Sequence, residues 1–539
     1  MSILIALVSA LTTLAASRTL LHLLQLESYQ LPGYRRAVFH NPWRACWPGL
    51  VCGVANIILI GVIAWRVNRL YVALDTSMDL QTDVLWILAA ALLCLIAGAA
   101  MEQIQRRTPA KKPFVITARI KRLYGTLFLV TLVWNIVFLY AVRIYAIALL
   151  TPIGVSAFVA LAVICAQPME KAISNRYFRD AQKKLADRPD LIKVGITGSY
   201  GKTSTKFMLA AILSEKYRTL ATPSSYNTPM GLTRVIREQL EPEHQVFIAE
   251  MGARHVGDIK ELCELVHPKY GILTSVGLQH LETFFSQENI TKTKYELIEA
   301  LPEDGVAVFP ADGAICEELY KRPAKHAKHL TGERAEGRGM LAKDVAVGPW
   351  GSRFTLINAD GQEALCETRL LGTHNIGNLM LACTMADVLG LTMEEITAGV
   401  KKVEPVEHRL QILHTDNGVT VIDDAFNSNP KGAHAALEVL KAFPQRRILI
   451  TPGMVELGAD EASHNRTFGE AIKDAADLVI LVGHHHTEPI AEGLAASGFS
   501  AENIHRVASL AEAQVKLGEL VQTGDTVLFE NDLPDNYTE

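Results

Sequence analysis

The sequence predicts an α-helical membrane domain followed by two α/β domains, of which the first is a P-loop domain with a parallel sheet and the second is Rossmann-like. Two observations carry this prediction. Long apolar runs gather in the first third of the 539-residue chain, and a glycine-rich phosphate loop follows them. We therefore expect a multi-span domain at 1–168, a linker helix at 169–190, a P-loop domain at 191–405 and a C-terminal domain at 406–539.

The membrane prediction depends on five apolar stretches, each close to the ~20 residues that a helix needs to cross a bilayer. They contribute to a hydrophobic content of 49% for the whole chain. The predicted spans are 3–24, 48–64, 84–100, 125–142 and 144–166.

Charged residues between these spans predict the orientation, because loops on the cytoplasmic side of a membrane carry an excess of Lys and Arg. The loops after the first and third spans are basic, and the loop after the second is acidic. The basic residues are Arg35, Arg36 and Arg44, then Arg106, Arg107, Lys111, Lys112, Arg119, Lys121 and Arg122, and the acidic ones are Asp75, Asp79 and Asp83. Five spans place the N-terminus outside and everything after 166 in the cytoplasm, where ATP is found.

Arg18 and His22 fall inside the first predicted span. Ionisable groups at that depth usually have a function or face the interior of a helix bundle. A long arginine side chain can also extend to the membrane surface, so both interpretations of Arg18 stay open.

Composition excludes several other classes of protein. The eight cysteines show no paired spacing, which argues against a disulfide framework and against a zinc site. The net charge of −5 is ordinary, and no basic aromatic stretch suggests nucleic-acid binding.

After the spans, a charged helix-compatible segment at 170–188 leads into alternating strands and helices. This alternation is typical of parallel sheets covered by helices. Strands are expected at 191–197, 246–251, 270–276 and 305–310, in a strand-rich interval at 341–371, and at 419–423, 447–451, 478–482 and 526–529.

The phosphate loop is Thr197-Gly-Ser-Tyr-Gly-Lys-Thr-Ser204, between a predicted strand and a predicted helix. Gly198 and Gly201 permit a tight turn around phosphates, and the helix N-terminus faces the anion. Lys202 would contact the β- and γ-phosphates, and the Thr203 hydroxyl would hold Mg²⁺. The loop is two residues shorter than the usual Walker loop. Its strand-to-helix context makes a simple glycine turn the weaker interpretation.

Further polar clusters follow later strands, where ligands of open α/β sheets collect. Glu250 ends an apolar strand and is a candidate Mg²⁺ ligand, with a helix cap as the alternative. His280 follows the next strand, although a lone histidine is often only a satisfied polar residue. Lys292 and Lys294 lie on a predicted helix, where lysines are usually solvated.

Taken together, these clusters resemble the Mur ligases, the ATP-dependent amide-forming enzymes of peptidoglycan precursor synthesis. The resemblance runs from about 191 to the C-terminus, and it is to the MurF type, which adds D-alanyl-D-alanine. Besides the phosphate loop, the matching stretches are Asn227-Thr-Pro-Met-Gly231, Glu250-Met-Gly-Ala253, His280-Leu-Glu282, Thr293-Lys-Tyr-Glu296, His374-Asn-Ile-Gly-Asn378, Asp423-Asp-Ala-Phe-Asn-Ser-Asn-Pro430 and Gly453-Met-Val-Glu-Leu-Gly458.

The resemblance implies a role for each matching residue. The nucleotide would be bound by Gly198, Ser199, Gly201, Lys202, Thr203, Ser204, His374, Asn375, Asn378, Arg409 and Asp424. The metal would be held by Thr203, Glu250, His280 and Lys294, with Lys294 matching a lysine that the family carbamylates. Catalysis would fall to Lys202, Lys294, His280 and Arg409, and substrate contacts to Asn227, Asn427, Glu456 and His464.

The implied reaction uses ATP and Mg²⁺ to activate a peptide carboxylate as an acyl phosphate, which an incoming amine then attacks. The amine would be an amino acid or a dipeptide such as D-Ala-D-Ala. The carboxyl donor would be a muropeptide or another envelope precursor, used by an enzyme in the bacterial cell membrane with its catalytic domains in the cytoplasm.

The chain departs from the family pattern at both ends. MurF-type enzymes begin with a soluble domain that binds the UDP end of the precursor, and apolar spans stand there in this chain. The donor could therefore be UDP-linked or lipid-linked. At the C-terminus a Lys-Gly-Ser-like turn is replaced by Glu530-Asn-Asp532, which would suit a cationic acceptor or a different substrate better than an anionic one.

Two alternatives remain at this stage. A capsule-type polyglutamate or polyamide synthase would share the ligase core and work at a membrane. A non-catalytic scaffold that senses nucleotide would keep the fold without turnover. The histidine run at 483–489 suggests a metal site, but a loop after a strand is the stronger interpretation.

Overall fold

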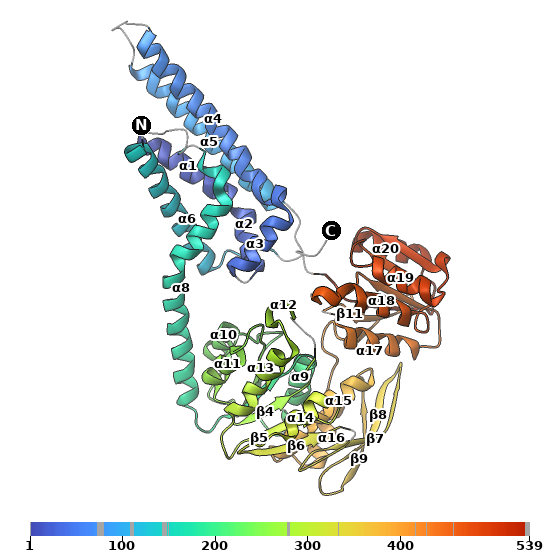
Figure 1. Ribbon diagram of the computed structural model, residues 1–539. Helices are drawn as coiled ribbons and strands as arrows, with labels where there is room; N and C mark the ends of the chain where they lie inside the picture. The colour runs from blue at the N-terminus through green and yellow to red at the C-terminus, as the bar shows by residue number, and fades with distance from the viewer. Residues whose placement is uncertain are drawn as a thin grey trace. The chain divides into compact units, whose positions relative to one another are not determined.

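The computed structural model describes residues 2–27, 29–72, 80–107, 113–142, 148, 150–277, 281–332, 334–415, 417–426, 428–455 and 457–533. The chain divides into two compact units, Met1–Asn175 and Arg176–Glu539 (Figure 1).

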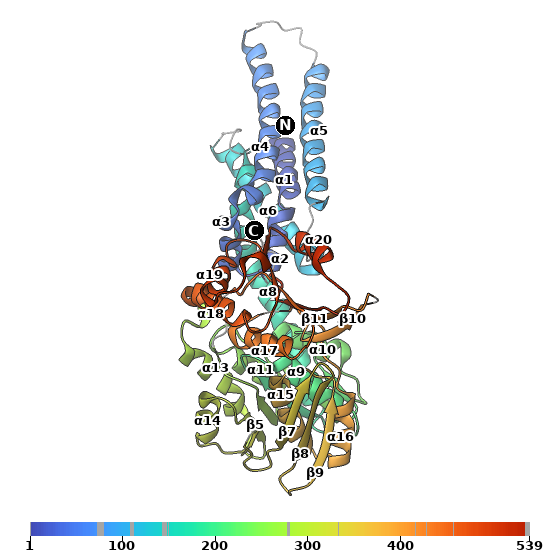
Figure 2. The ribbon, with the colours of Figure 1, turned by 90° about the vertical axis from the view of Figure 1, so that its right-hand side faces the viewer.

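Unit 1 is built from helices. They are α1 (Ser2–Ala16), α2 (Arg18–Leu26), α3 (Leu31–His40), α4 (Pro42–Val72), α5 (Leu80–Arg107), α6 (Ala118–Val137), the π-helix η1 (Phe138–Val142), the 3-10 helix η2 (Thr151–Gly154) and α8 (Val155–Ala186). α4 and α5 lie side by side as a long pair in both views (Figures 1 and 2). Leu20 and Leu24 of α2 pack with Leu127 of α6 and Val159 of α8 in one apolar core.

Three helices in the described part of the chain are long and apolar enough to cross a membrane: Leu85–Arg107, Ala118–Tyr140 and Thr151–Ala186. A fourth is obtained if the bent pair Ile3–Ala16 and Arg18–Leu26 is one broken span. This pair covers the first predicted stretch, and the helix axis turns by 46° at the break.

The break lies at Ser17. The Ser17 Oγ donates to the carbonyl of Leu14 at 2.7 Å, a local bond of the kind that competes with the helical pattern. The predicted stretch 48–64 lies within α4, whose side chains are described only in part, and 143–147 falls outside the described residues.

Unit 2 begins with a six-stranded parallel sheet in the order β2-β3-β1-β4-β5-β6. Its strands are β1 (Ile192–Thr197), β2 (Thr219–Ala221), β3 (Val246–Glu250), β4 (Tyr270–Leu273), β5 (Val306–Pro310) and β6 (Ala327–Thr331). Its helices are α9 (Lys202–Leu213), α10 (Pro229–Gln239), α11 (Asp258–Val266), α12 (Leu281–Phe284), α13 (Gln287–Ala300) and α14 (Ala314–Lys321). β3 is buried throughout, as expected for a central parallel strand with both faces covered.

One face of this sheet packs on α10, α11, α13 and α14, and the other on α9 and two later helices, α15 (Thr373–Val388) and α16 (Met393–Lys402). The predicted strand-rich interval forms a three-stranded antiparallel sheet of β7 (Leu341–Gly348), β8 (Gly351–Ile357) and β9 (Glu363–Thr368). The order β3-β1-β4 brings the carboxyl ends of these three strands together at one edge.

A second six-stranded sheet follows in the order β10-β11-β15-β12-β13-β14, and only its edge strand β10 is antiparallel to its neighbour. Its strands are β10 (Gln411–His414), β11 (Thr420–Asp424), β12 (Arg447–Thr451), β13 (Leu478–Val482), β14 (Ile504–Val507) and β15 (Thr526–Glu530). Its helices are α17 (Pro430–Lys441), α18 (Glu461–Ile472), α19 (Glu488–Ser497) and α20 (Leu510–Leu520), with short 3-10 turns η3 (Gly458–Asp460) and η4 (Ala501–Asn503). The four strands predicted in this region are confirmed.

Candidate functional site

The phosphate loop joins β1 to α9, as the sequence predicts. Gly201 precedes α9 with φ +81°, and Gly198 has φ +152°, both in the region that favours glycine. A Cβ atom at Gly198 would overlap the hydroxyl of Thr274, and one at Gly201 would overlap the side-chain amide of Asn378. The loop therefore requires glycine for two reasons, its backbone conformation and its close neighbours. A cradle that admits no Cβ fits a bound phosphate chain.

Lys202 lies across this loop. Its ammonium donates to the carbonyls of Gly198 at 2.7 Å and Ser199 at 2.9 Å. Burial, reinforced by the charge of Arg409, lowers the pKa of Lys202 to about 8, and Glu250 opposes the shift. An ammonium held by carbonyl oxygens at the centre of the loop is available to phosphate oxygens, which are stronger acceptors.

Glu250 ends β3 and is almost fully enclosed, with 1% of its side chain exposed. Its Oε1 accepts from Thr203 Oγ1 at 3.1 Å and from Asn227 Nδ2 at 3.0 Å. A hydroxyl and a carboxylate oxygen at this separation, next to a phosphate loop, fit the hard oxygen ligands that Mg²⁺ takes. Thr203, Asn227 and Glu250, predicted separately from three motifs, thus meet in one place.

Lys206 is a site residue that the sequence analysis missed. Its side chain is 0% exposed, and its ammonium pairs with Glu250 Oε2 at 3.0 Å and donates to the carbonyl of Ser224. The available signal was its spacing: Lys206 lies one helical turn after Lys202, so both face the same strand ends.

Lys294 lies on α13 with 2% of the residue exposed. Burial and the nearby positive charge of Lys202 lower its pKa well below the ordinary value, while Asp258 and Glu296 act in the opposite sense. Lys292, two residues earlier, is exposed. The structure therefore distinguishes the two lysines and places Lys294, like Glu250, beside Lys202.

A cavity of about 510 Å³ opens next to the loop. It is lined by Gly201 and Ser204 from the loop, by the start of α15, and by residues of the C-terminal sheet. The predicted nucleotide residues along its wall are Gly201, Ser204, His374, Asn375, Asn378, Arg409 and Asp424. Burial lowers the pKa of His374 to about 4, with Lys431 adding to the effect, so the imidazole is neutral at physiological pH.

Arg409 and Asp424 reach this cavity from the C-terminal sheet. The Arg409 guanidinium stacks on the Phe426 ring, with 4.4 Å between Cζ and the ring centroid. Burial and the charge of Glu530 raise the pKa of Asp424 to about 8, although Arg409 lowers it. Asp424 and Glu530 face each other in register on β11 and β15.

The acidic C-terminal turn points inward. Glu530 is buried, and its carboxylate accepts from Ser428 Oγ and from Thr451 Oγ1, the latter at 2.7 Å. Asn531 donates to the carbonyl of Gly453 at 2.6 Å. The Glu530 carboxylate is thus used inside the domain, which differs from the acceptor contact expected from sequence.

Other predicted residues are not brought to the cavity wall. His464 lies in α18 and is absent from the described lining. His280, Asn427 and Glu456 fall outside the described residues. Among the residues described, no group of three His, Cys, Asp or Glu side chains is placed to hold a metal ion. In the histidine run, His486 Nδ1 lies 2.7 Å from the Glu461 carboxylate.

Comparison with known protein families gives two matches. The profile described as "Mur ligase middle domain" matches residues 196–386, and that described as "Mur ligase, glutamate ligase domain" matches 408–530.

Relatives are described as UDP-N-acetylmuramoyl-tripeptide–D-alanyl-D-alanine ligases. One from Mycobacterium leprae is 31% identical over 366 residues, covering 62% of this chain and 70% of the relative. One from Mycobacterium tuberculosis is 34% identical over 303 residues, covering 54% of this chain, which spans 58% of that relative's length.

Two solved structures are similar. MurF from Acinetobacter baumannii superposes with a TM-score of 0.61 at 25% identity, covering 68% of this chain and 78% of its own. MurF from Thermotoga maritima, in complex with ADP, gives a TM-score of 0.59 at 25% identity, covering 67% of this chain and 80% of its own.

Proposed function

Since this chain belongs to the Mur ligase family, we propose that it is a membrane-anchored, ATP-dependent ligase that joins a peptide carboxylate to an amino acid or dipeptide in cell-envelope synthesis. The observation that carries the proposal is the convergence of Lys202, Glu250 and Lys294 at one edge of the parallel sheet. A scaffold without catalysis has no need for three ionisable side chains beside a phosphate loop, of which Glu250 and Lys294 are buried.

ATP supplies the phosphoryl group that activates the carboxylate as an acyl phosphate. Lys202 and the loop amides would hold its phosphates, and Thr203 with Glu250 would hold Mg²⁺. The cavity beyond Gly201 would take the nucleoside, with the neutral His374 and Asn378 along its wall. The ADP complex of the Thermotoga maritima relative supports this assignment.

We also propose that Lys294 is carbamylated. The neutral amine is the form that adds CO₂, and burial together with Lys202 favours that form. A carbamate carries negative charge, so it would attract both Mg²⁺ and Lys202, where an ammonium would repel them. His280 would also contribute to holding the metal.

The acceptor is proposed to be D-Ala-D-Ala or a related amine, because the relatives are described as UDP-N-acetylmuramoyl-tripeptide–D-alanyl-D-alanine ligases. For the carboxyl donor we propose a muropeptide that is UDP-linked or lipid-linked. The matched regions begin only at residue 196, and unit 1 precedes them in the chain.

We propose that unit 1 spans the bacterial cell membrane and that the catalytic domains lie in the cytoplasm. Exposed apolar side chains on the candidate spans support this, among them Leu92 and Leu93 on α5 and Leu129 and Val133 on α6. A reporter fused after Glu539 should give a cytoplasmic signal, and an external signal would contradict the proposal.

The activity test measures phosphate release by the detergent-purified full-length protein. Mg-ATP is supplied with UDP-linked or lipid-linked muropeptides, and with amino acids or D-Ala-D-Ala. We expect release that depends on both partners, lost in Lys202→Ala and Lys294→Ala. Lys292→Ala, on the exposed face of the same helix, serves as the matched control and should keep turnover.

Two results would change the assignment. Turnover with a polyglutamate acceptor and none with any muropeptide would favour the capsule-type alternative. Full activity in Lys202→Ala or Lys294→Ala would remove the proposed catalytic site.

A further inference from the structure

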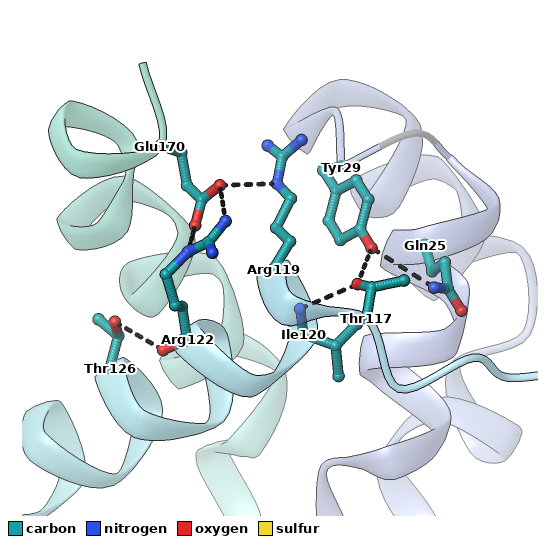
Figure 3. Close-up of polar contacts among 8 residues, drawn as sticks. All are labelled: Gln25, Tyr29, Thr117, Arg119, Ile120, Arg122, Thr126 and Glu170. Atoms are coloured by element: carbon teal, nitrogen blue, oxygen red, sulfur yellow. Dashed lines mark hydrogen bonds and ion pairs between the residues drawn. The ribbon is translucent and has the colours of Figure 1, made fainter. Parts of the chain in front are cut away.

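A second group of polar and charged residues lies in unit 1, whereas the proposed nucleotide site belongs to unit 2. It consists of Tyr29, Thr117, Arg119, Arg122 and Glu170, from the end of α2, the start of α6 and the middle of α8 (Figure 3). None of the proposed ligase roles uses these residues.

The group is held in place by a strap, residues 113–117, that leads into α6. Gln25 of α2 clamps the strap by accepting from Val115 N at 3.1 Å and donating to Val115 O at 2.9 Å. Thr117 caps α6 by accepting from Ile120 N at 3.2 Å. Val115 and Ile116 are more than half exposed. The first turn of α6 is thus fixed beside an outward-facing apolar edge.

The first five residues of α6 include Arg119, Lys121 and Arg122. Cations are unfavourable at this end of a helix, because the backbone there already presents partial positive charge. Arg122 is compensated: it forms a two-point ion pair with Glu170 at 2.5 and 2.8 Å. Glu170 is 8% exposed, and its closest contacts are with Arg122, while its ion pair with Arg119 is longer, at 3.6 Å.

The positive charge of Arg119 is compensated less closely than that of Arg122. Its Nε is buried without a hydrogen-bond partner in the described structure, and it lies 3.6 Å from Glu170 Oε2. Its guanidinium stacks on the Tyr29 ring, with 4.0 Å between Cζ and the ring centroid. In Figure 3 its two terminal nitrogens point away from the Glu170 carboxylate, and 40% of the side chain is exposed. A guanidinium fixed by an aromatic face presents a planar pair of N–H groups, which matches a phosphate.

The position of Arg119 along α6 indicates which kind of phosphate can reach its guanidinium. α6 becomes apolar after Arg122, and α8 is apolar up to Met169 and charged from Glu170. Both helices thus change character at the level of the Arg122–Glu170 pair, where a membrane would meet water. α8 continues from there to Ala186, so this is the side of the membrane on which the ligase unit follows.

We propose that Arg119 and the first turn of α6 bind the phosphate group of a lipid headgroup at the membrane surface. This rests on the proposed membrane location of unit 1. A phosphate there neutralises the excess positive charge of the helix start, while its acyl or isoprenoid chain lies against the apolar surface below. A lipid that carries the carboxyl donor through a phosphate would be placed by this contact.

The test is native mass spectrometry of the full-length protein in detergent. Four lipids are added singly: geranylgeranyl diphosphate, phosphatidic acid, phosphatidylglycerol and diacylglycerol. A fifth arm contains inorganic pyrophosphate. We expect the phosphate lipids to bind, diacylglycerol and pyrophosphate to bind at least tenfold more weakly, and Arg119→Ala to lose about tenfold or more in affinity for the lipid phosphates.

Lys121→Ala is the matched control, because it removes the same charge from the same turn but on an exposed face two residues away. It should change affinity by less than about twofold. Tyr29→Leu should weaken binding by removing the face that orients Arg119, and Arg119→Lys should not restore it. Preference among the phosphate lipids identifies the source: binding confined to the diphosphate indicates a carrier lipid, and equal binding of phosphatidylglycerol indicates bulk lipid.

The proposal is overturned if Arg119→Ala, folded by its melting curve, binds the lipids like the parent, or if pyrophosphate binds as tightly. Its outcome is separate from that of the ligase assignment. Lys202→Ala should lose turnover and keep lipid binding, and lipid binding without turnover by any variant would contradict the ligase while leaving this site intact.

Discussion

The pair formed by Lys206 and Glu250 makes a quantitative prediction about stability. Lys206→Met keeps most of the aliphatic side chain and removes only the ammonium. Glu250 would then remain enclosed, with Oε1 bonded to Thr203 and Asn227 and Oε2 left without its cation. The carbonyl of Ser224 would lose its donor as well.

Removing one partner of a buried ion pair costs about 3–5 kcal/mol, because the remaining charge cannot return to water. Both side chains here are at most 1% exposed, so solvent screening does not reduce this figure. A domain of this size loses about 2–4 °C of melting temperature per kcal/mol, which predicts a fall on the order of 10 °C. A stability of about 5–15 kcal/mol lets the variant still fold.

Amide hydrogen exchange of β1 and β3 in the full-length protein is the appropriate assay, since it reports the opening free energy of this sheet alone. The control is Lys402→Met. Lys402 also pairs with a glutamate, Glu215, at 2.7 Å, but its side chain is 64% exposed. Its loss should cost under about 1 kcal/mol.

The double variant Lys206→Met/Glu250→Gln separates the ion pair from packing. Removing both charges should recover about 2 kcal/mol or more relative to the sum of the two single variants. Additive single effects, or a cost for Lys206→Met no larger than that of Lys402→Met, would refute the argument that this pair is buried and coupled.

Three further predictions concern the nucleotide site. Gly201→Ala should weaken Mg-ATP binding about tenfold or more in calorimetry, because both the φ of +81° and the nearby Asn378 side chain oppose a Cβ atom. Gly257→Ala is the control: its φ is +93° but no atom in the described part of the chain lies near the added Cβ, and it should leave Mg-ATP binding unchanged. Asp424 has a pKa near 8 in the folded protein and an ordinary pKa of 3.8, so its contribution to stability is present at low pH and is lost as pH rises toward 8. Asp424→Asn should therefore reduce the fall in melting temperature as pH rises toward 8, measured by thermal melting at a series of pH values. His374, with a pKa near 4, does not titrate between pH 5.5 and 8, so His374→Gln should leave the shape of the pH profile of nucleotide affinity in this range unchanged.

Much of the ligase unit could be predicted from the sequence because its signals are local. The loop glycines, the apolar run of β3 and the carboxylate that ends it are each contained within a few residues. Their convergence follows from a general rule, since central parallel strands end at one edge.

The first predicted membrane stretch shows what a local pattern leaves open. Residues 3–24 are apolar enough for one span, yet the helix breaks at Ser17 and turns by 46°. The hydroxyl bond at the break is visible only once the backbone is in place. In the same way, the pairing of Asp424 with Glu530 depends on the register of two strands about a hundred residues apart.

The two charged sites share a property that sequence spacing does not reveal. In each site, two cations lie about one helical turn apart on the same helix. A carboxylate from another element pairs closely with one of them: Glu250 with Lys206, and Glu170 with Arg122. The neighbouring cation remains available to an anionic ligand: Lys202 donates to the loop carbonyls of Gly198 and Ser199, and the terminal nitrogens of Arg119 point away from Glu170. Which cation is neutralised depends on where the carboxylate's strand or helix packs. A variant in which the carboxylate pairs instead with the neighbouring cation, Lys202 or Arg119, should therefore lose phosphate binding, although the net charge of the site is unchanged.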